Sequence, residues 1–215
     1  MTHLCLAVGH TWEMEVHKGR AETPQTVRSR ATHERITSSL IRLIESGHHN
    51  PGASEVAVNA EVSLRTIFHH FHDLDQMYSA ALAAQAMHAQ STLIDIDATE
   101  TLDLRCRGIS VNRDSIYASL APTLRAYVAN PNRAARLAEH EGHEALVRAM
   151  QHQARATFGR ELRQLPDPLA ALLGVETALS FAVWDYLHRV HGVSREGTRQ
   201  YMSALALSIT RSFGA

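Results

Sequence analysis

The sequence predicts an all-α protein, in which a small N-terminal helix-turn-helix domain precedes a larger helical domain. Apolar residues recur three and four positions apart along most of the chain, which is the period of an amphipathic helix. Short clusters rich in proline, glycine and asparagine interrupt this period and mark the connections between helices. Within the first third of the chain, residues 53–71 have the pattern of two short helices joined by a tight turn.

Composition and charge exclude several classes of protein. No stretch has the roughly 18 consecutive apolar residues needed to cross a bilayer, and Leu4–Val8 is too short for a signal peptide, so we expect a cytoplasmic protein without a membrane partner. Cys5 and Cys106 are distant in sequence, which disfavours a disulfide framework or a cysteine zinc site. The net charge of −1 gives no basic footprint for nucleic acid.

The chain begins with residues 1–22, which show no sustained period and are predicted to form a flexible arm. Thr23-Pro24 then opens the first helix, because proline suits the first helical position after a threonine cap. Gly47 ends this helix, and Asn50-Pro51-Gly52 connects it to the next. The apolar residues of the first helix are Val27, Ala31, Ile36, Leu40, Leu43 and Ile44.

Residues 53–71 complete a predicted three-helix domain that spans residues 23–73. Val56 and Ala57 give the second helix its apolar side, and Ser63 is a candidate N-cap for the third. Ile67 and Phe71 lie four residues apart, so both can face the first helix. The side chains left outside are Leu64, Arg65, Thr66, His69 and His70. This is the geometry of a recognition helix shaped to enter a DNA major groove, although an αα-hairpin without a DNA role has a similar rhythm.

The residues between Ile36 and Asp73 also resemble the N-terminal domain of the TetR family of bacterial transcriptional regulators. The positions that carry the resemblance are Ile36, Leu43, Ile44, Gly47, Val56-Ala57, Val62-Ser63, Thr66-Ile67-Phe68, His70-Phe71 and Asp73. The resemblance implies an all-helical homodimer with a DNA-binding domain and a C-terminal domain for ligand binding and dimerisation. Its implied partners are a double-stranded, palindromic DNA operator, an unidentified small-molecule ligand and a second copy of the chain.

Under this resemblance, we predict that Arg65 and Thr66 contact base edges and that His69 and His70 contact phosphates. The complete set of predicted DNA-binding residues is Gly52, Ser63, Leu64, Arg65, Thr66, Phe68, His69 and His70. Three positions depart from the family pattern. Gly52 replaces a capping Thr or Ser, Phe68 replaces a Tyr, and Leu74 replaces a Lys. Each replacement removes a contact to the DNA backbone, so we expect weaker binding or compensation by the histidines.

The second domain, residues 74–215, is predicted to contain several more helices. Asp73 caps a helix over residues 74–90, and residues 91–101 form a loop. A helix then begins at Leu102, and Pro122 kinks or ends it before a short continuation to Val128. Single helices are expected over residues 133–165 and 168–191, and Gly192-Val193-Ser194 is the turn before the last one.

The last two helices are predicted to form half of a four-helix dimer interface. Residues 168–191 are apolar on more than one face, and Tyr201, Leu205 and Ile209 form a stripe on the final helix. The alternative is that both helices only close a monomeric core. Residues 178–187 and 191–194 also resemble the C-terminal region of a broad subgroup of TetR-like proteins.

The resemblance implies a ligand pocket among the middle helices, with Tyr117, Tyr127, Met150, Phe158 and Trp184 as candidate lining residues. Ordinary core packing is the alternative for each of them. Arg105, Arg113 and Arg125 are candidate partners for an anionic ligand.

No catalytic or metal-binding constellation is visible, so we predict a non-enzyme without a cofactor or metal. His140 and His143 are three residues apart, whereas the zinc-binding His-Glu-x-x-His motif places its histidines four apart. The sequence has no glycine-rich phosphate loop and no nucleophile elbow. The predicted function is a repressor that a small molecule releases from its operator. Two alternatives stay open: a metal-responsive sensor on the same fold, and a helical dimer that has lost DNA binding and acts as an interaction module.

Overall fold

The computed structural model describes residues 24–212, and its regular elements there are all helical, which confirms the predicted all-α class. In order, they are α1 Pro24–Glu45, α2 Ala53–Asn59, α3 Leu64–His70, α4 Leu74–Ser91, α5 Leu102–Val128, α6 Pro131–Ala135, the 3-10 turn η1 Leu137–Glu139, α7 Glu141–Leu162, α8 Pro168–Ala178, α9 Phe181–Arg189 and α10 Arg195–Ser212. The predicted arm and the Thr23 cap lie outside the described residues.

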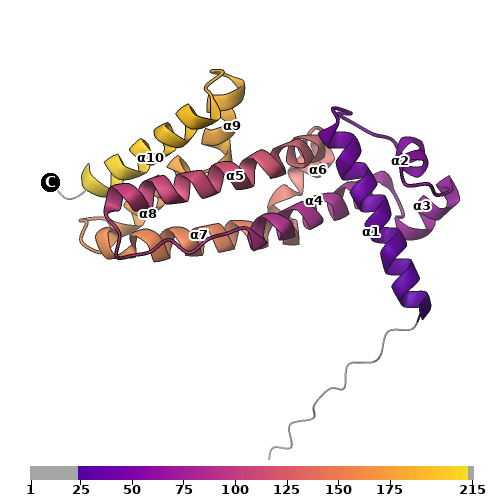
Figure 1. The fold of residues 1–215 in the computed structure, drawn as a ribbon, viewed down its shortest axis with the longest axis horizontal. Coiled ribbons are helices and arrows are strands. Elements are labelled where there is room, and N and C mark those ends of the chain that lie inside the picture. The colour runs from indigo at the N-terminus through magenta and orange to yellow at the C-terminus, as the bar shows by residue number, and fades with distance from the viewer. Residues whose placement is uncertain (1–23, 213–215) are drawn as a thin grey trace, which may run out of the picture.

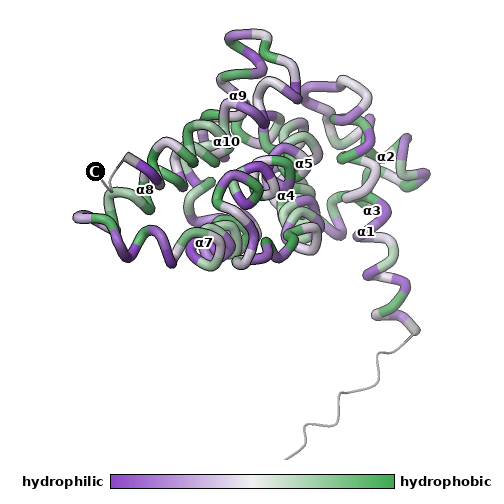
Figure 2. Tube along the Cα trace, turned by 60° about the vertical axis from the view of Figure 1, so that its left-hand side comes forward, coloured by the Kyte–Doolittle hydropathy of each residue, from purple (hydrophilic) through white to green (hydrophobic). Residues whose placement is uncertain are grey.

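Helices α1–α3 pack together at one end of the molecule, while α5 and α7 run along its long axis (Figure 1). Helix α4 connects the two parts, because its Met77 and Tyr78 are fully buried at the α1–α3 end while Ala86 and Ala89 are buried further along. Buried apolar side chains from both parts join in one continuous hydrophobic cluster. Hydrophobic positions recur along α8 and α10 as well (Figure 2).

Pro122 does not end α5, which continues to Val128 as one helix. A proline inside a helix lacks the N–H that would bond to the carbonyl four residues earlier. Here that loss is offset by packing, since Leu120, Ala121 and Leu124 around the proline are all buried. Of the two predicted outcomes at Pro122, a kink or a helix end, the end is therefore wrong, because tertiary burial keeps the segment helical to Val128.

Two of the long predicted helices are divided. The predicted helix over residues 133–165 consists of α6, η1 and α7, because His140 caps α7 instead of lying within a helix. The predicted helix over residues 168–191 is interrupted at Leu179-Ser180, where the Ser180 side chain accepts a hydrogen bond from the Val183 N–H. By composition alone, Pro168–Arg189 is the one stretch of the described chain apolar enough to span a membrane. The interruption leaves pieces of 11 and 9 residues, each well short of the roughly 20 that a spanning helix needs.

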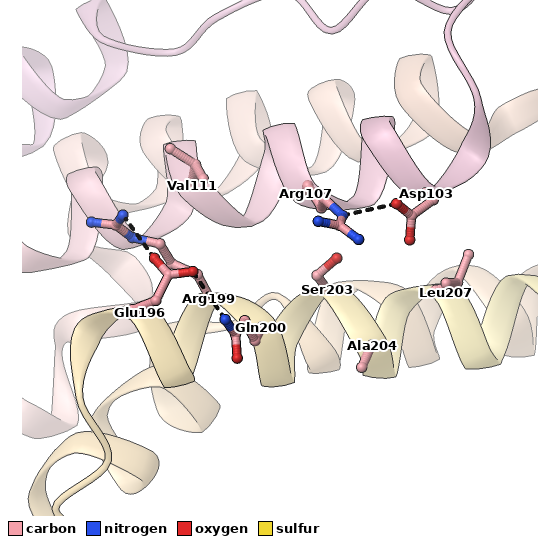
Figure 3. A pocket seen from close by; sticks show the side chains of 9 residues that line it. All are labelled: Asp103, Arg107, Val111, Glu196, Arg199, Gln200, Ser203, Ala204 and Leu207. Carbon is pink, nitrogen blue, oxygen red and sulfur yellow. Dashed lines mark hydrogen bonds and ion pairs between the residues drawn. The ribbon is translucent and has the colours of Figure 1, made fainter.

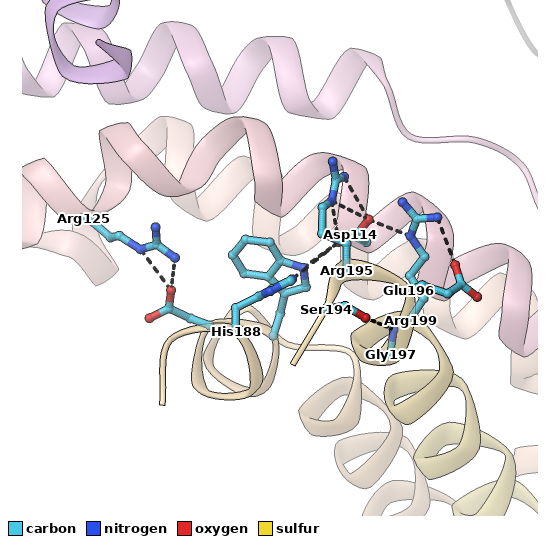
Figure 4. Close-up of polar contacts among 10 residues, drawn as sticks. Asp114, Arg125, His188, Ser194, Arg195, Glu196, Gly197 and Arg199 are labelled. Carbon is cyan, nitrogen blue, oxygen red and sulfur yellow. Dashed lines mark hydrogen bonds and ion pairs between the residues drawn. The ribbon is translucent and has the colours of Figure 1, made fainter. Parts of the chain in front are cut away.

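A buried carboxylate ties α5 to the C-terminal helices (Figure 4). Asp114 on α5 is fully buried and accepts hydrogen bonds from Trp184 Nε1 at 2.9 Å, Arg195 Nη2 at 2.9 Å and Arg199 Nε at 2.7 Å. Burial on its own raises the pKa of Asp114, but these hydrogen bonds outweigh it and hold the pKa below its ordinary value. The carboxylate is therefore ionised and fixes the positions of α9 and α10 on α5.

Candidate DNA-binding surface and ligand cavity

The helix-turn-helix is positioned by a small core shared with α1. Ile36 and Leu40 from α1 meet Val56 from α2 and Ile67 from α3, all of them buried. The turn requires Glu61 to adopt a left-handed backbone conformation with φ of 53°, which is uncommon for a residue other than glycine. Two short helices that cannot bury themselves are thus held rigidly against a third.

The first turn of α3 is fixed by Ser63, whose hydroxyl accepts a hydrogen bond from the Thr66 N–H at 3.0 Å, as the N-cap prediction requires. The Ser63 and Thr66 hydroxyls share a second hydrogen bond at 2.8 Å. Thr66 is half-buried, and its hydroxyl is engaged with Ser63 at the start of the helix. Gly52 occupies the N-cap of α2 without a side-chain hydrogen bond, and its N–H donates to Glu55 Oε2 at 2.8 Å instead.

The outward face of α3 combines one cation with apolar groups. Leu64, Arg65, Phe68 and His69 are exposed and follow each other at the spacing of one helical face. Within residues 24–212, the Arg65 side chain has no hydrogen bond or ion pair, so its guanidinium is free to contact another molecule.

His70 lies at the edge of this face and is half-buried. Its ring is 6.3 Å from the His33 ring and 5.5 Å from the His69 ring. Burial, and to a lesser extent the neighbouring His69 and His33, lower the pKa of His70. His70 is therefore mostly neutral at pH 7 and contributes little charge toward a phosphate there.

A cavity of about 360 Å³ lies among α5, α7 and the α8–α9 junction. Its lining residues are mainly apolar, with a few polar groups, which is the usual make-up of a small-molecule site. They are Arg113, Tyr117, Leu120, Leu124, Leu137, His143, Leu146, Val147, Met150, Gln151, Ala154, Glu176, Leu179, Ser180, Phe181 and Ala182.

The polar groups of the cavity wall differ in how well they are satisfied. Arg113 is buried and donates to Gln153 Oε1 at 2.6 Å and to the Met150 carbonyl at 2.7 Å. Tyr117 donates to the Leu179 carbonyl at 2.7 Å, and burial raises the pKa of Tyr117 to about 12, so its hydroxyl stays protonated. Glu176 Oε1 and His143 Nδ1, in contrast, are buried without a hydrogen-bond partner among the described residues.

The cavity is joined to the helix-turn-helix through the start of α7. His140 Nε2 contacts the Ser79 carbonyl of α4 at 3.0 Å, while His140 Nδ1 contacts the His143 N–H at 3.3 Å. A neutral imidazole with its proton on Nε2 satisfies both contacts. At Gly142, an added Cβ would lie 3.0 Å from the Ala83 Cα, so glycine permits α7 to approach α4 closely.

Arg133 on α6 makes the second connection to α4. Its buried guanidinium forms an ion pair with Asp75 at 3.0 Å and lies 4.0 Å from the centre of the Tyr78 ring. The Tyr78 hydroxyl donates to the Pro51 carbonyl at 3.2 Å, immediately before α2. Residues 130–143 therefore contact both the cavity wall and the helix that carries the helix-turn-helix.

No family model and no curated protein sequence matches this chain. Solved structures, in contrast, match most of this chain. A transcriptional regulator from Rhodococcus sp. RHA1 is 17% identical, with a TM-score of 0.59 and an alignment over 85% of this chain and 98% of that one. A structure from Mesorhizobium loti, described as a TetR-family transcriptional regulator, is 16% identical, with a TM-score of 0.54 over 90% of this chain and 100% of that one. This chain has the TetR-family fold.

Within the TetR-family fold, the predicted ligand-binding residues occupy different places. Tyr117 and Met150 line the cavity. Tyr127 lies outside it, beside His140, and its carbonyl accepts a hydrogen bond from Arg133. Phe158 is fully buried in the core, and the Trp184 indole N–H donates a hydrogen bond to Asp114. Sequence reasoning missed Glu176 and His143, because only the packing of α7 against α8 shows that both face one space.

The three candidate arginines for an anionic ligand are also separated in the TetR-family fold. Arg105 pairs with Glu161, and Arg125 pairs with Asp185, so both have carboxylate partners. Arg113 alone of the three lines the cavity.

The histidine pair that resembles a zinc motif does not form a shared helical face, since His140 is the cap of α7 and its ring bonds to the His143 N–H. Across the described residues, no three side chains of the metal-binding types gather at one point.

A second groove lies between α5 and α10 (Figure 3), with a volume of about 370 Å³. Its charged side chains are already paired. Arg107 bonds to Asp103 at 2.8 Å, while Arg199 reaches both Asp114 and Glu196. The groove thus offers fewer unsatisfied groups to a ligand than the cavity beside Glu176.

Proposed function

We propose that this protein is a DNA-binding transcriptional regulator of the cytoplasm, without enzymatic activity, whose α3 enters the major groove. The supporting observation is the outward face of α3, where an unpartnered Arg65 lies between Leu64 and Phe68. A guanidinium can donate two hydrogen bonds to guanine, and apolar side chains can contact the methyl group of thymine. Arg65 and Phe68 together therefore offer base-specific contacts even though the Phe68 ring lacks a hydroxyl for a phosphate.

Selection of bound duplexes from a random pool tests this function. We expect an inverted repeat, because two α3 helices related by a twofold axis read two half-sites. Recovery of no enriched motif would favour the alternative of an interaction module, for which the exposed Leu64 and Phe68 would be a protein-binding surface.

A homodimer through α8 and α10 is part of the proposal. Leu169 and Leu173 on α8 and Tyr201 and Leu205 on α10 are all exposed, with Leu169 65% and Tyr201 57% accessible. Large apolar side chains on two adjacent helices of one chain are typical of a self-complementary interface. A second copy would cover this face and place two recognition helices in one assembly.

Leu173→Asp should convert the dimer to a monomer, because it places a charge in the centre of that face, where desolvation is unfavourable. The measurement is molar mass by light scattering after size exclusion. Met87→Asp is the matched control, since Met87 on α4 is 69% accessible and lies away from α8 and α10. A wild-type monomer, or a Leu173→Asp dimer of unchanged mass, would contradict the proposed interface.

We further propose that ligand binding in the cavity moves the helix-turn-helix and releases the DNA, as in a repressor. The contacts of His140 with Ser79 and of Arg133 with Asp75 support this route, because residues 130–143 also include the cavity residues Leu137 and His143. A ligand that favours a different position of α7 would shift α4 and the turn before α2. Coupling of this type is worth roughly 1–3 kcal/mol between two sites.

A further inference from the structure

We infer that the cavity binds a largely apolar small molecule that carries a hydrogen-bond donor, a hydroxyl or ammonium group, and that Glu176 is the acceptor for that group. The inference rests on the proposed function in one respect, since it takes this cavity to be the site of the regulator's ligand. It adds the chemical class of that ligand, which neither the fold nor its structural relatives specify.

The unsatisfied acceptor on Glu176 is the first argument. Glu176 Oε1 is buried, lines the cavity and has no hydrogen-bond partner among residues 24–212. Glu176 Oε2 has only a long contact of 3.4 Å with Gln151 Nε2. No arginine, lysine or histidine of the described chain lies within ion-pair distance of this carboxylate. Buried polar groups in native proteins normally have a hydrogen-bond partner. An unpaired carboxylate oxygen that faces an apolar cavity therefore indicates that a bound ligand supplies the donor.

The state of the only arginine in the wall gives the second argument. Arg113 already donates to Gln153 Oε1 and to the Met150 carbonyl at short distances, so its guanidinium is fixed by two neutral acceptors. Burial lowers the pKa of Arg113, in part offset by Tyr117 and Glu176. An anionic ligand would add its own charge next to the unpaired Glu176, and like charges at close range are unfavourable in a buried site. The wall therefore favours a donor over a carboxylate.

The size and length of the cavity indicate the shape of the remaining, apolar part of the ligand. A volume of about 360 Å³ is at the lower end for small-molecule sites and suits a bicyclic apolar body. His143 and Gln151 are eight residues apart on α7, which is roughly 12 Å along a helix. Glu176, beside Gln151, and His143 therefore lie toward opposite ends of the space. His143 Nδ1 is also without a partner, and burial lowers the pKa of His143, so the neutral ring offers a second polar contact at the far end.

Four naphthalene derivatives test the inference, using the full chain in the absence of DNA. They are 2-naphthalenemethanol, 2-naphthylmethylamine, 2-(methoxymethyl)naphthalene and 2-naphthoate, which share one apolar body and differ in the polar group. We expect the alcohol or the amine to bind at least about tenfold more tightly than the methyl ether and the carboxylate, the factor that a hydrogen bond to a charged acceptor typically carries. Dissociation constants are measured by calorimetry.

The decisive variant is Glu176→Leu, which keeps the approximate size of the side chain and removes the acceptor. It is expected to abolish the preference for the donor over the ether while leaving ether binding unchanged. The Glu176 carboxylate has one buried oxygen without a partner among the described residues and one long contact of 3.4 Å with Gln151, so its removal should cost little stability and the variant should fold. Glu144→Leu is the matched control, because Glu144 is exposed on α7 and outside the cavity wall. It should retain the wild-type preference.

The inference is overturned if the ether or carboxylate binds as tightly as the alcohol and amine, if no member of the series binds, or if Glu176→Leu keeps the donor preference. Its failure is distinguishable from failure of the proposed function. Donor-dependent binding by a protein that selects no DNA motif would uphold the ligand class and remove the regulator proposal. A protein that selects an operator but shows no donor preference would remove the ligand class alone.

Discussion

Replacing Asp114 by alanine is expected to lower the free energy of unfolding by about 3 kcal/mol, because breaking a buried ion pair from one side leaves its partners without compensation. Trp184 Nε1 would lose its buried acceptor, and Arg195 and Arg199 would lose the charge that fixes α10 to α5. The value is at the lower end for buried pairs because the Arg195 side chain is 52% accessible and can return to water. Urea denaturation at fixed protein concentration measures the effect.

Asp103→Ala provides the control on the same helix. Asp103 pairs with Arg107 four residues later, and both side chains are substantially exposed, so its loss should change stability by less than about 1 kcal/mol. An equal loss of stability in the two variants would show that the contacts of Asp114 with Trp184, Arg195 and Arg199 do not hold α9 and α10 in place.

The difference in unfolding free energy between wild type and Asp114→Ala should depend on pH, with a sign that follows from the pKa of Asp114. The pKa of Asp114 is depressed in the folded state, so its stabilising contribution is fully present above the unfolded pKa of about 3.9 and is lost as pH falls through the folded pKa. Protonation of Asp114 should therefore not reduce the difference in unfolding free energy between wild type and Asp114→Ala above about pH 5. Through this group, the difference should shrink only in more acidic solution.

The helix-turn-helix was predictable from sequence because its determinants are local. Ser63 is followed by a helix in which Ile67 and Phe71 are four residues apart, and both are buried while Arg65 is exposed. Cap chemistry and apolar spacing both act within one or two turns of the chain. The same local signals placed both ends of α1 and α4 within a few residues of their observed bounds, and they placed the start of α5 at Leu102.

The C-terminal breaks were not predictable in this way, because contacts distant in sequence decide them. The hydroxyl of Tyr117 on α5 binds the Leu179 carbonyl between α8 and α9, and this bond spans 62 residues of the chain. Ser180 is a typical cap residue, but the apolar residues on both sides of it conceal that signal. Likewise, Arg133 reaches Asp75 and Tyr78 on α4, a partnership that no local pattern indicates.

Arg65→Ala is expected to weaken binding to the selected operator by roughly tenfold to a hundredfold, since a base-specific arginine contact is worth about 1–3 kcal/mol. The loss should be largest for duplexes with the preferred base at one position of each half-site, because a base contact carries sequence information and a phosphate contact does not. Arg107→Ala is the control, since Arg107 on α5 is exposed and remote from α3. It should leave operator affinity unchanged.

The most direct measurement is a titration of wild-type and Arg65→Ala protein, at one salt concentration, against the selected operator and a scrambled duplex of the same composition. Wild type is predicted to bind the operator at least about a thousandfold more tightly than the scrambled duplex, with two protomers per site, and Arg65→Ala is predicted to narrow that ratio. Equal affinity of wild type for the two duplexes, or an unchanged ratio in Arg65→Ala, would contradict the assignment of α3 as a recognition helix.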